Sequence, residues 1–337
     1  MSSLKPIIAR LARGDTLSEQ ESEAAFTAMM EGGATQAQVG AILMALRLRG
    51  ETIEEVTGAV RAMRAKMRVI DAPDNAIDVC GTGGDGMGSL NVSTAVAFIC
   101  AACGVPVAKH GNKAASSKSG AADVLTALGV NIEADYPIME RALAEIGTAF
   151  LWAQRHHSAM RHVGTSRAEL GTRTIFNVMG PLSNPAQVKR QLIGVFDRQW
   201  LEPLAKTLAQ LGAERAWLVH GEDGLDEITV TGTSEIIELD HGRLRRFTVS
   251  PKDFGLSPAP LAAIKGDGPD HNADALRRLL AGEKSPYRDI VLMNAAAALA
   301  IAGHASSLEG GASLAAQAID SGAARARLDA LVKITNG

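Results

Sequence analysis

Two polar segments between residues 79 and 123 could together bind a polyphosphate. The first is a glycine-rich turn with the sequence GTGGDG at residues 81–86, and the second is the basic segment KHGNK at residues 109–113. Glycine lets backbone N–H groups approach anionic oxygens closely, the start of a following helix adds the positive end of its dipole, and lysine supplies countercharge. The two segments therefore predict phosphate chemistry.

The glycine turn also satisfies the G-x-G-x-x-G pattern of dinucleotide-binding folds. That pattern needs an acidic residue about 20 positions further on, at the end of the second strand, to bind a ribose hydroxyl. Here the second predicted strand is followed by Lys109 and His110. Asp85 inside the turn would repel a pyrophosphate lying directly on it, unless it faces a ribose hydroxyl or a metal ion. A nicotinamide-dependent dehydrogenase is therefore disfavoured, and the sequence contains no P-loop motif G-x-x-x-x-G-K-[ST].

Four hydroxyl and amide side chains follow the glycine turn, at Ser89, Asn91, Ser93 and Thr94. Any one of them could simply cap the helix expected to begin there. Four such groups beside one glycine turn favour a ligand-binding role. The acidic loop GEDGLDE at residues 221–227 could in turn hold a divalent cation, although adjacent carboxylates in a loop are usually only solvated.

The elements around these segments alternate between strand and helix. The expected order is a strand at 76–80, a helix at 93–102, a strand at 105–108 and a helix at 121–128. Alternation of this kind implies parallel strands with crossover helices, whose ligands gather at the carboxyl ends of the strands. Further strands are expected at 216–220 and 228–230, an ordered loop with a short helix at 155–185, and alanine-rich helices from about residue 286.

The first 70 residues are expected to be purely helical. Three helix starts have capping-box spacing, namely Ser18 with Glu21, Thr35 with Gln38, and Thr52 with Glu55, and apolar residues recur behind them at helical period. This segment contains no cluster of catalytic residue types. It predicts a small helical bundle.

Length and composition limit the class of protein. A chain of 337 residues is expected to form about two domains, and its hydrophobic and charged fractions are those of an ordinary globular protein. The net charge of −3 disfavours a general nucleic-acid binder, and no stretch is apolar enough for a membrane span or a secretory signal. Three cysteines without a pairing pattern fit a reducing compartment, so the expected location is the cytoplasm.

The motifs resemble those of the anthranilate phosphoribosyltransferases, which act in tryptophan biosynthesis. In chain order the resemblance rests on GTGGDG at 81–86, NVSTA at 91–95, KHGN at 109–112, HSAM at 157–160, Arg167, TIFN at 174–177, GPLSNP at 180–185 and Asp226-Glu227. It spans nearly the whole chain, the helical N-terminal segment included. It implies transfer of phosphoribose from 5-phosphoribosyl-1-diphosphate to the amino group of anthranilate, with Mg²⁺ (two ions per monomer) and loss of pyrophosphate.

The resemblance also implies an architecture. It is an α/β protein with a small N-terminal α-helical domain, residues 1–72, and a larger α/β domain, residues 73–337, whose mostly parallel sheet is flanked by helices. The segment at about 165–190 is expected to pack with the helical domain. The family further implies a homodimer formed through the helical domain.

The residue roles implied by the resemblance fall into three groups. The donor 5-phosphoribosyl-1-diphosphate would be bound by Gly81, Gly84, Asp85, Ser89, Asn91, Val92, Ser93, Thr94, Lys109, His110, Gly111, Asn112, Lys113, Ala114, Ala115, Ser116, Ser117 and Ala121. Anthranilate would be bound by Gly81, His110, Asn112, His157, Arg167, Gly180 and Pro181. The metal ligands would be Ser93, Asp226 and Glu227.

Some positions depart from the family pattern. Lys113 stands where the family usually has arginine, and Ala121 stands where a serine often contacts the donor. Lys113 keeps the charge but loses the bidentate fork. These changes concern donor affinity and not the type of reaction.

No catalytic residue is assigned with certainty. The chain shows no Ser/His/Asp or Cys/His constellation, and an aromatic amine is already neutral at pH 7. Lys109 and the metal are therefore expected to act by charge stabilisation. Two alternatives remain: a pyrimidine nucleoside phosphorylase of the same fold, and a non-catalytic paralogue that binds nucleic acid.

Overall fold

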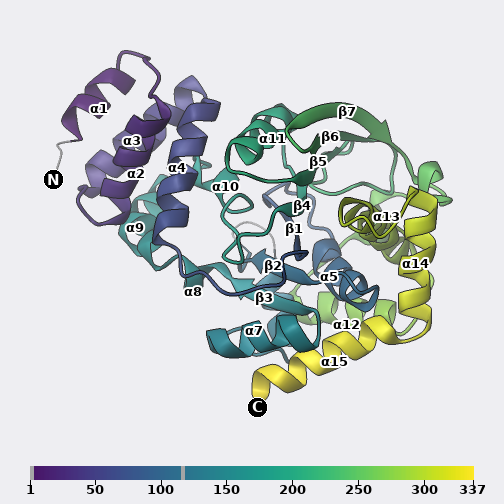
Figure 1. Cartoon of the computed structure of the whole chain (residues 1–337). Helices are drawn as coiled ribbons and strands as arrows, with labels where there is room; N and C mark the ends of the chain where they lie inside the picture. The colour runs from purple at the N-terminus through teal and green to yellow at the C-terminus, as the bar shows by residue number, and fades with distance from the viewer. Residues whose placement is uncertain (1–3, 115–117) are drawn as a thin grey trace.

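The computed structural model describes residues 4–114 and 118–337, so Ala115, Ser116 and Ser117 of the predicted donor site lie outside the described residues. The chain begins with four helices, which form a bundle at one side of the molecule (Figure 1). They are α1 (Lys5–Leu11), α2 (Glu19–Met30), α3 (Gln36–Arg49) and α4 (Ile53–Lys66). All three predicted capping boxes are present and start α2, α3 and α4.

The segment after the third strand contains more helix than the sequence predicted. It forms α8 (Ala153–His156), a 3₁₀ turn (Ser158–Met160), α9 (Arg161–Leu170) and α10 (Phe176–Met179). The expectation of a loop with only a short helix was wrong for α9, which buries only Val163 and Ser166 and so has little apolar periodicity. The backbone N–H of Ser166 donates to Oε1 of Gln36 at 3.1 Å, which places α9 against α3 of the bundle.

The remaining chain builds one seven-stranded sheet. Its strands are β1 (Ile77–Gly81), β2 (Val107–Gly111), β3 (Thr148–Trp152), β4 (Arg190–Gly194), β5 (Arg215–Gly221), β6 (Ser234–Asp240) and β7 (Arg243–Val249). The spatial order is β3-β2-β1-β4-β5-β6-β7, with the first five strands parallel and β6 and β7 antiparallel. The predicted fold class, a helical unit beside a mostly parallel α/β sheet, is confirmed.

Two strand predictions were wrong. Residues 228–230 form no strand, because the chain between β5 and β6 is a turn-rich loop. The second predicted strand begins later and ends later, as β2, so Lys109 and His110 lie inside a buried strand instead of in a following loop. Strands β3, β4, β6 and β7 were not predicted. Most residues of the edge strand β7 are exposed, and four of its seven are Arg or Thr.

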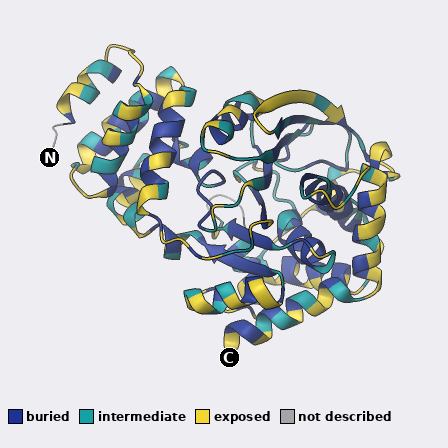
Figure 2. Ribbon diagram, viewed as in Figure 1, coloured by how far each residue is buried: buried dark blue, intermediate teal, exposed yellow. Residues whose placement is uncertain are grey.

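Helices cover both faces of the sheet. They are α5 (Val92–Ala102), α6 (Ala121–Ala127), α7 (Tyr136–Glu145), α11 (Leu201–Gln210), α12 (Pro269–Leu280), α13 (Pro286–Ile301), α14 (Leu308–Asp320) and α15 (Ala323–Asn336). Helix α13 is buried along almost its whole length, whereas α14 and α15 lie outside it with one exposed side (Figure 2). In the described part of the chain, no helix is long and apolar enough to cross a bilayer.

The apolar core has two parts. One part lies under α5, α12, α13 and the C-terminal helices. The other joins the helical bundle to α11 and to one face of the sheet, where it includes Cys80 of β1, Ile193 of β4 and Leu218 of β5. The bundle therefore packs on the sheet through a shared core.

The strand order determines where a ligand can bind. From β1 the chain adds β2 and then β3 on one side, while β4 and β5 lie on the other side of β1. In open parallel sheets, ligands bind outside the carboxyl ends of the strands where the order reverses. Here that point is the gap between the ends of β1 and β4.

Candidate active site

The glycine turn and the acidic loop meet at the ends of β1 and β4. Gly81 pairs with Gly194, and both residues contact Asp226. A Cβ atom at Gly194 would lie 1.5 Å from the backbone oxygen of Asp226, and one at Gly81 would lie 2.5 Å from its Oδ2. The backbone N–H of Gly83 donates to the same Oδ2 at 2.8 Å. Two glycines therefore allow the acidic loop to lie directly on the strand ends.

Three carboxylates gather at this contact. Asp226 lies beside Asp85, and burial together with the charge of Asp85 raises the pKa of Asp226 to about 7. Burial and the charge of Asp226 also raise the pKa of Glu227 well above its ordinary value. Oδ2 of Asp85 is buried and has no hydrogen-bond partner among the described residues. These three carboxylates repel one another when they are ionised, and a bound cation would offset that repulsion.

Lys109 supplies the positive charge next to these acids. Its side chain is only 3% exposed, and Nζ donates to the carbonyl oxygen of Val79 at 2.7 Å and to Oγ of Ser93 at 3.1 Å. Burial lowers the pKa of Lys109, while Asp78 behind it and Glu227 in front of it oppose that shift. The backbone N–H of Ser93 donates to the Glu227 carboxylate. Lys109, Ser93 and Glu227 thus form one connected group.

The start of α5 presents the predicted polar side chains. Asn91 is the N-cap residue, and Val92, Ser93 and Thr94 form the first turn. The hydroxyl of Thr94 is buried and has no hydrogen-bond partner in the described part of the chain. Nδ2 of Asn272 donates to Oδ1 of Asn91 at 2.9 Å. The first turn of α5 therefore presents a hydroxyl without a partner. Its first N–H groups have no partners within the helix, so they could bind an anion.

The loop before α5 is held by a segment that the sequence did not single out. Ser89 pairs with Lys265 in an isolated antiparallel bridge, and the N–H of Leu90 donates to the carbonyl oxygen of Ile264 at 2.9 Å. The residues around 264–272 carry no recognisable binding motif. Their role is visible only because the fold places them beside the glycine turn.

The loop after β2 folds back on the start of α6. Oδ2 of Asp123 accepts from the backbone N–H groups of Ala114 and Gly120, both at 2.9 Å. Oδ1 of Asn112 accepts from Nε1 of Trp152 at 3.2 Å, and Nζ of Lys113 lies 5.4 Å from the centre of the Trp152 ring. Ala121 begins α6 and lies next to Gly111. Asn112, Lys113 and Ala114 therefore lie close to the start of α6 at Ala121, beside the end of β2.

Two histidines, His110 near the carboxyl end of β2 and His157 after α8, form a neutral pair. Nδ1 of His110 bonds to the carbonyl oxygen of Gly180 at 3.2 Å, and Nε2 lies 3.2 Å from Nε2 of His157. A carbonyl accepts only, so His110 carries its proton on Nδ1 and His157 donates from Nε2. Burial lowers the pKa of His110 well below its ordinary value and that of His157 to about 4. Pro181, which follows Gly180 in the chain, accepts through its carbonyl oxygen from Nε2 of Gln191 at 2.8 Å.

Two arginines come from α9 and the segment that follows it, and only Arg173 contacts the glycine turn. The guanidinium of Arg167, at the end of α9, lies 5.0 Å from the ring centre of Phe176, and burial lowers its pKa. Arg173 was not singled out from the sequence. Its guanidinium stacks 3.8 Å from the ring centre of Phe196, and its Nη2 lies 2.7 Å from where a Cβ of Gly84 would be. No ion pair or hydrogen bond engages Arg173 within the described chain, so it faces the glycine turn as a free cation.

The residues present fit a hard divalent cation, provided that a substrate completes the coordination. Asp226, Glu227 and the Ser93 hydroxyl are oxygen donors, as Mg²⁺ prefers, and an unpartnered oxygen of Asp85 lies beside them. Among residues 4–114 and 118–337, however, no three His, Cys, Asp or Glu side chains are arranged as a complete metal site. Such an ion would therefore need water or substrate oxygens as further ligands.

Comparison with known families assigns the class. Residues 5–67 match the helical bundle domain of a glycosyl transferase family, and residues 73–325 match the a/b domain of the same family. The two matched regions correspond to the bundle and to the sheet with its helices. The chain thus belongs to the class of glycosyl transferases.

Relatives narrow the class further. Anthranilate phosphoribosyltransferase from Rhodospirillum rubrum is 58% identical over 333 residues, which cover 99% of this chain and 96% of that protein. The crystal structure of the Thermus thermophilus enzyme of that name superposes with a TM-score of 0.93 at 43% identity, covering 98% of this chain and 99% of that one. The Saccharomyces cerevisiae enzyme in complex with PRPP and Mg gives 0.91 at 27% identity, covering 99% and 98%. The chain belongs to the anthranilate phosphoribosyltransferase family.

The close contact at Gly194 gives a first prediction. In Gly194→Ala the new methyl group must displace the backbone of Asp226, so we expect a loss of about 1–3 kcal/mol in the free energy of unfolding. Gly164→Ala is the matched control, since a Cβ there meets nothing within 4 Å and the residue lies in α9. Chemical denaturation measures both. Equal stability of the two variants would contradict the close contact.

Proposed function

We propose that the protein transfers the phosphoribosyl group of 5-phosphoribosyl-1-diphosphate to the amino group of anthranilate and releases pyrophosphate, a step of tryptophan biosynthesis. The proposal rests on one observation: the glycine turn, buried Lys109 and the Asp226-Glu227 pair lie together at the carboxyl ends of β1 and β4. It is supported by 58% identity to a relative of that name over nearly the full length.

The donor would lie along the glycine turn and the start of α5. Free backbone N–H groups of the first turn and the Thr94 hydroxyl would bind its phosphate oxygens, and Lys109 would neutralise their charge. Arg173 would contribute a second cation from the opposite side of the turn. Asn112, Lys113 and Ala121 would border the other end of the donor.

Magnesium would be held by Ser93, Asp226 and Glu227 together with diphosphate oxygens. When bound, Mg²⁺ neutralises charge on the leaving diphosphate. Two ions per monomer are proposed, because Asp85 and Asp226 on one side and Glu227 and Ser93 on the other offer separate oxygen donors.

Anthranilate would lie between the histidine pair and α9. The guanidinium fork of Arg167 matches a planar carboxylate. Gly81, Asn112, Gly180 and Pro181 would border the same space. His110 and His157 are neutral, so they would contribute shape and hydrogen bonds without a charge that competes for the carboxylate.

The proposed reaction breaks the bond between the anomeric carbon and a diphosphate oxygen. A new bond then joins that carbon to the amine nitrogen, which loses a proton. The amine is neutral before attack, so the protein needs no strong base to activate it. Its contribution is to hold the two substrates together and to stabilise the negative charge on the leaving group with Lys109.

The test of this function is a fluorescence assay for N-(5-phosphoribosyl)anthranilate with the purified protein, both substrates and Mg²⁺. In Arg167→Ala, loss of a charge-assisted pair worth about 1.5–3 kcal/mol should raise the apparent KM for anthranilate by about tenfold to a hundredfold. The KM for the donor should stay nearly unchanged.

Arg173→Ala provides the reciprocal control for Arg167→Ala. It should raise the KM for the donor and leave that for anthranilate nearly unchanged, since Arg173 faces the glycine turn. If both variants raised the same KM, the assignment of the two arginines to different substrates would be wrong. If the wild-type protein formed no product, the proposed reaction itself would fail.

The raised pKa of Asp226 predicts a pH-dependent response to Mg²⁺. Its carboxyl has a pKa of about 7 in the folded protein against 3.8 ordinarily, so the folded state binds the extra proton between these values. The stability of the metal-free protein should therefore fall as pH rises through that window. Above pH 7 the ionised group is free to bind metal, whereas at lower pH metal must displace a proton.

Thermal unfolding with and without Mg²⁺ measures this effect. The increase in Tm on adding Mg²⁺ should be clearly larger at pH 8 than at pH 6, without any substrate present. In Asp85→Asn the neighbouring charge is removed, so the pKa of Asp226 falls and the difference between the two pH values should shrink. An equal Mg²⁺ effect at both pH values in the wild-type protein would contradict the prediction.

The helical bundle is the proposed dimer interface. On α3, Ala37, Ala41, Met44 and Leu48 follow helical spacing along one side, and Leu48 is 80% exposed. A large apolar side chain on an exposed helix face is typical of an interaction surface. We propose a cytoplasmic homodimer joined through this face, with residues 1–72 and the segment near 165–190 as its helical domain and residues 73–337 as its catalytic domain.

Leu48→Glu tests the interface. A buried, unpaired carboxylate would be introduced into it twice in a symmetric dimer, so we expect the molar mass from light scattering to fall to that of a monomer. Leu314→Glu is the control, since Leu314 is a partly exposed leucine on α14, far from the bundle in the chain. A dimer that persists in Leu48→Glu would exclude this face.

A further inference from the structure

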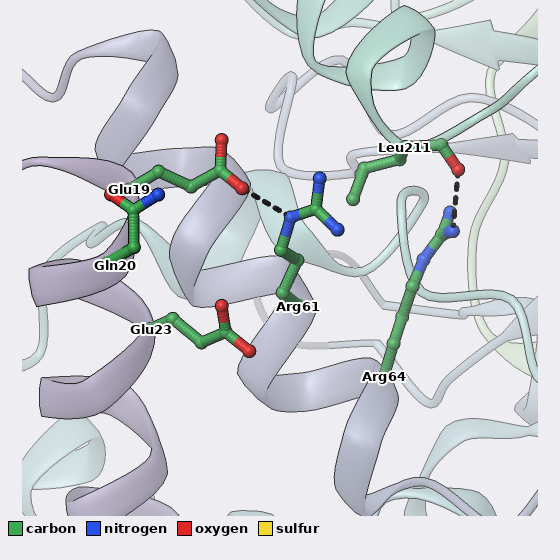
Figure 3. Close-up of a pocket in the computed structure, with 6 residues that line it drawn as sticks. All are labelled: Glu19, Gln20, Glu23, Arg61, Arg64 and Leu211. Carbon is green, nitrogen blue, oxygen red and sulfur yellow. Dashed lines mark hydrogen bonds and ion pairs between the residues drawn. The ribbon is translucent and has the colours of Figure 1, made fainter.

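A cavity of about 380 Å³ lies between the helical bundle and the α/β unit, away from the candidate active site. Side chains from α2, α4 and the end of α11 converge on it (Figure 3). It is lined by Glu19, Gln20, Glu23, Arg61, Arg64 and Leu211. Its volume falls within the range of about 300–1,000 Å³ that small-molecule sites occupy. None of these residues belongs to the site proposed for the reaction.

Of the two arginines in the cavity, Arg61 pairs with Glu19, whereas Arg64 hydrogen-bonds, among the described residues, only to carbonyl oxygens. Nε of Arg64 donates to the carbonyl oxygen of Leu182 at 2.7 Å, and Nη1 lies 3.5 Å from that of Leu211. Arg64 has no ion pair in the described part of the chain, and Arg61 lies one turn before it on α4. Burial and the charge of Arg61 lower the pKa of Arg64 to about 10, so it remains charged at neutral pH. An anion between the two guanidinium groups would relieve their repulsion.

The anionic side has a free carboxylate. Glu19 pairs with Nε of Arg61 at 2.5 Å, but Glu23, one turn further along α2, makes no ion pair or hydrogen bond through its side chain among the described residues. In Figure 3 the Glu23 carboxylate points into the gap between α2 and α4, on the side of Arg61. An ammonium group would fit at this position. A simple anion would be repelled by the two glutamates, and a simple cation by the two arginines.

The cavity continues along α2 into a less polar space. A second cavity of about 600 Å³ shares Gln20 and Glu23 with the first. It adds Ala24, Thr27, Ala28 and Gly33, together with Glu31, whose carboxylate pairs with Lys66. A ligand with its charged groups among the arginines and Glu23 would therefore have room for an apolar side chain along this part of α2.

We propose that the cavity binds a free α-amino acid as a zwitterion, with its carboxylate on Arg61 and Arg64 and its ammonium group on Glu23. The ligand would contact α2 and α4 of the bundle and Leu211 at the end of α11. It would therefore connect the helical bundle to the α/β unit. The site goes beyond the proposed transfer reaction, because it uses none of the residues assigned to that reaction.

Calorimetric titration of the full chain tests the proposal with L-phenylalanine and two analogues. 3-Phenylpropanoate lacks the ammonium group, and 2-phenylethylamine lacks the carboxylate. All titrations contain saturating anthranilate, so that binding of aromatic acids in the active site does not contribute. L-Phenylalanine should bind at least about tenfold more tightly than either analogue, since each analogue loses one charge-assisted contact. Equal affinities, or no binding of L-phenylalanine, would overturn the proposal.

Variants locate the site. In Glu23→Gln the affinity for L-phenylalanine should fall to that for 3-phenylpropanoate, whereas the affinity for 3-phenylpropanoate should not fall. Glu54→Gln, on the exposed side of α4, is the matched control and should bind L-phenylalanine like the wild-type protein. Arg64→Lys keeps the charge without the guanidinium fork and should weaken both acids. Unchanged discrimination in Glu23→Gln would reject this cavity as the site. Product formation without any amino acid tests the reaction separately.

Discussion

The buried ammonium group of Lys109 is the charge on which the rest of the site depends. It lies inside β2, between Asp78 and Glu227, and it donates to the carbonyl oxygen of Val79 within β1 and to the Ser93 hydroxyl in the first turn of α5. A lysine so deeply buried is stable only with charged and hydrogen-bonding partners around it. Three segments that are distant in the sequence must therefore come together before this charge can be accommodated. The same arrangement leaves Lys109 next to the place where a diphosphate would develop negative charge.

The acidic loop is the second constraint on the site. Glycines at 81 and 194 bring Asp226 into contact with the ends of two neighbouring strands, where Asp85 already supplies negative charge. The free protein holds these carboxylates close together at a cost, which is visible in their raised pKa values. A divalent cation bound together with a diphosphate would offset the repulsion between the carboxylates. The site is thus arranged for the liganded state and not for the empty one.

Local signals were sufficient to predict much of this structure. The three capping boxes and the glycine turn depend on residues within a few positions of one another, and they lie where the sequence predicted them. Lys109 was predicted to follow the strand at 105–108, whereas it lies inside β2, where Asp78 and Glu227 offset the cost of burying its charge. Arg173, the segment near 264–272 and the edge strand β7 had no local signature. Arg173 and the segment near 264–272 take their positions from residues far away in the chain, which a single sequence does not display. Strand β7 pairs with β6, its neighbour in the chain, but its residues are mostly exposed and lack apolar alternation.

The second part of the apolar core limits how the molecule can be divided. Phe26 and Val60 of the bundle share that cluster with Cys80, Ile193 and Leu218, whose strands carry the active site on their carboxyl ends. If the first 66 residues were deleted, α11 would still cover part of this face of the sheet, but the apolar side chains that now pack on the bundle would be exposed to water. We therefore expect that neither the bundle nor the α/β unit would remain stable when it is separated from the other or fused to an unrelated protein.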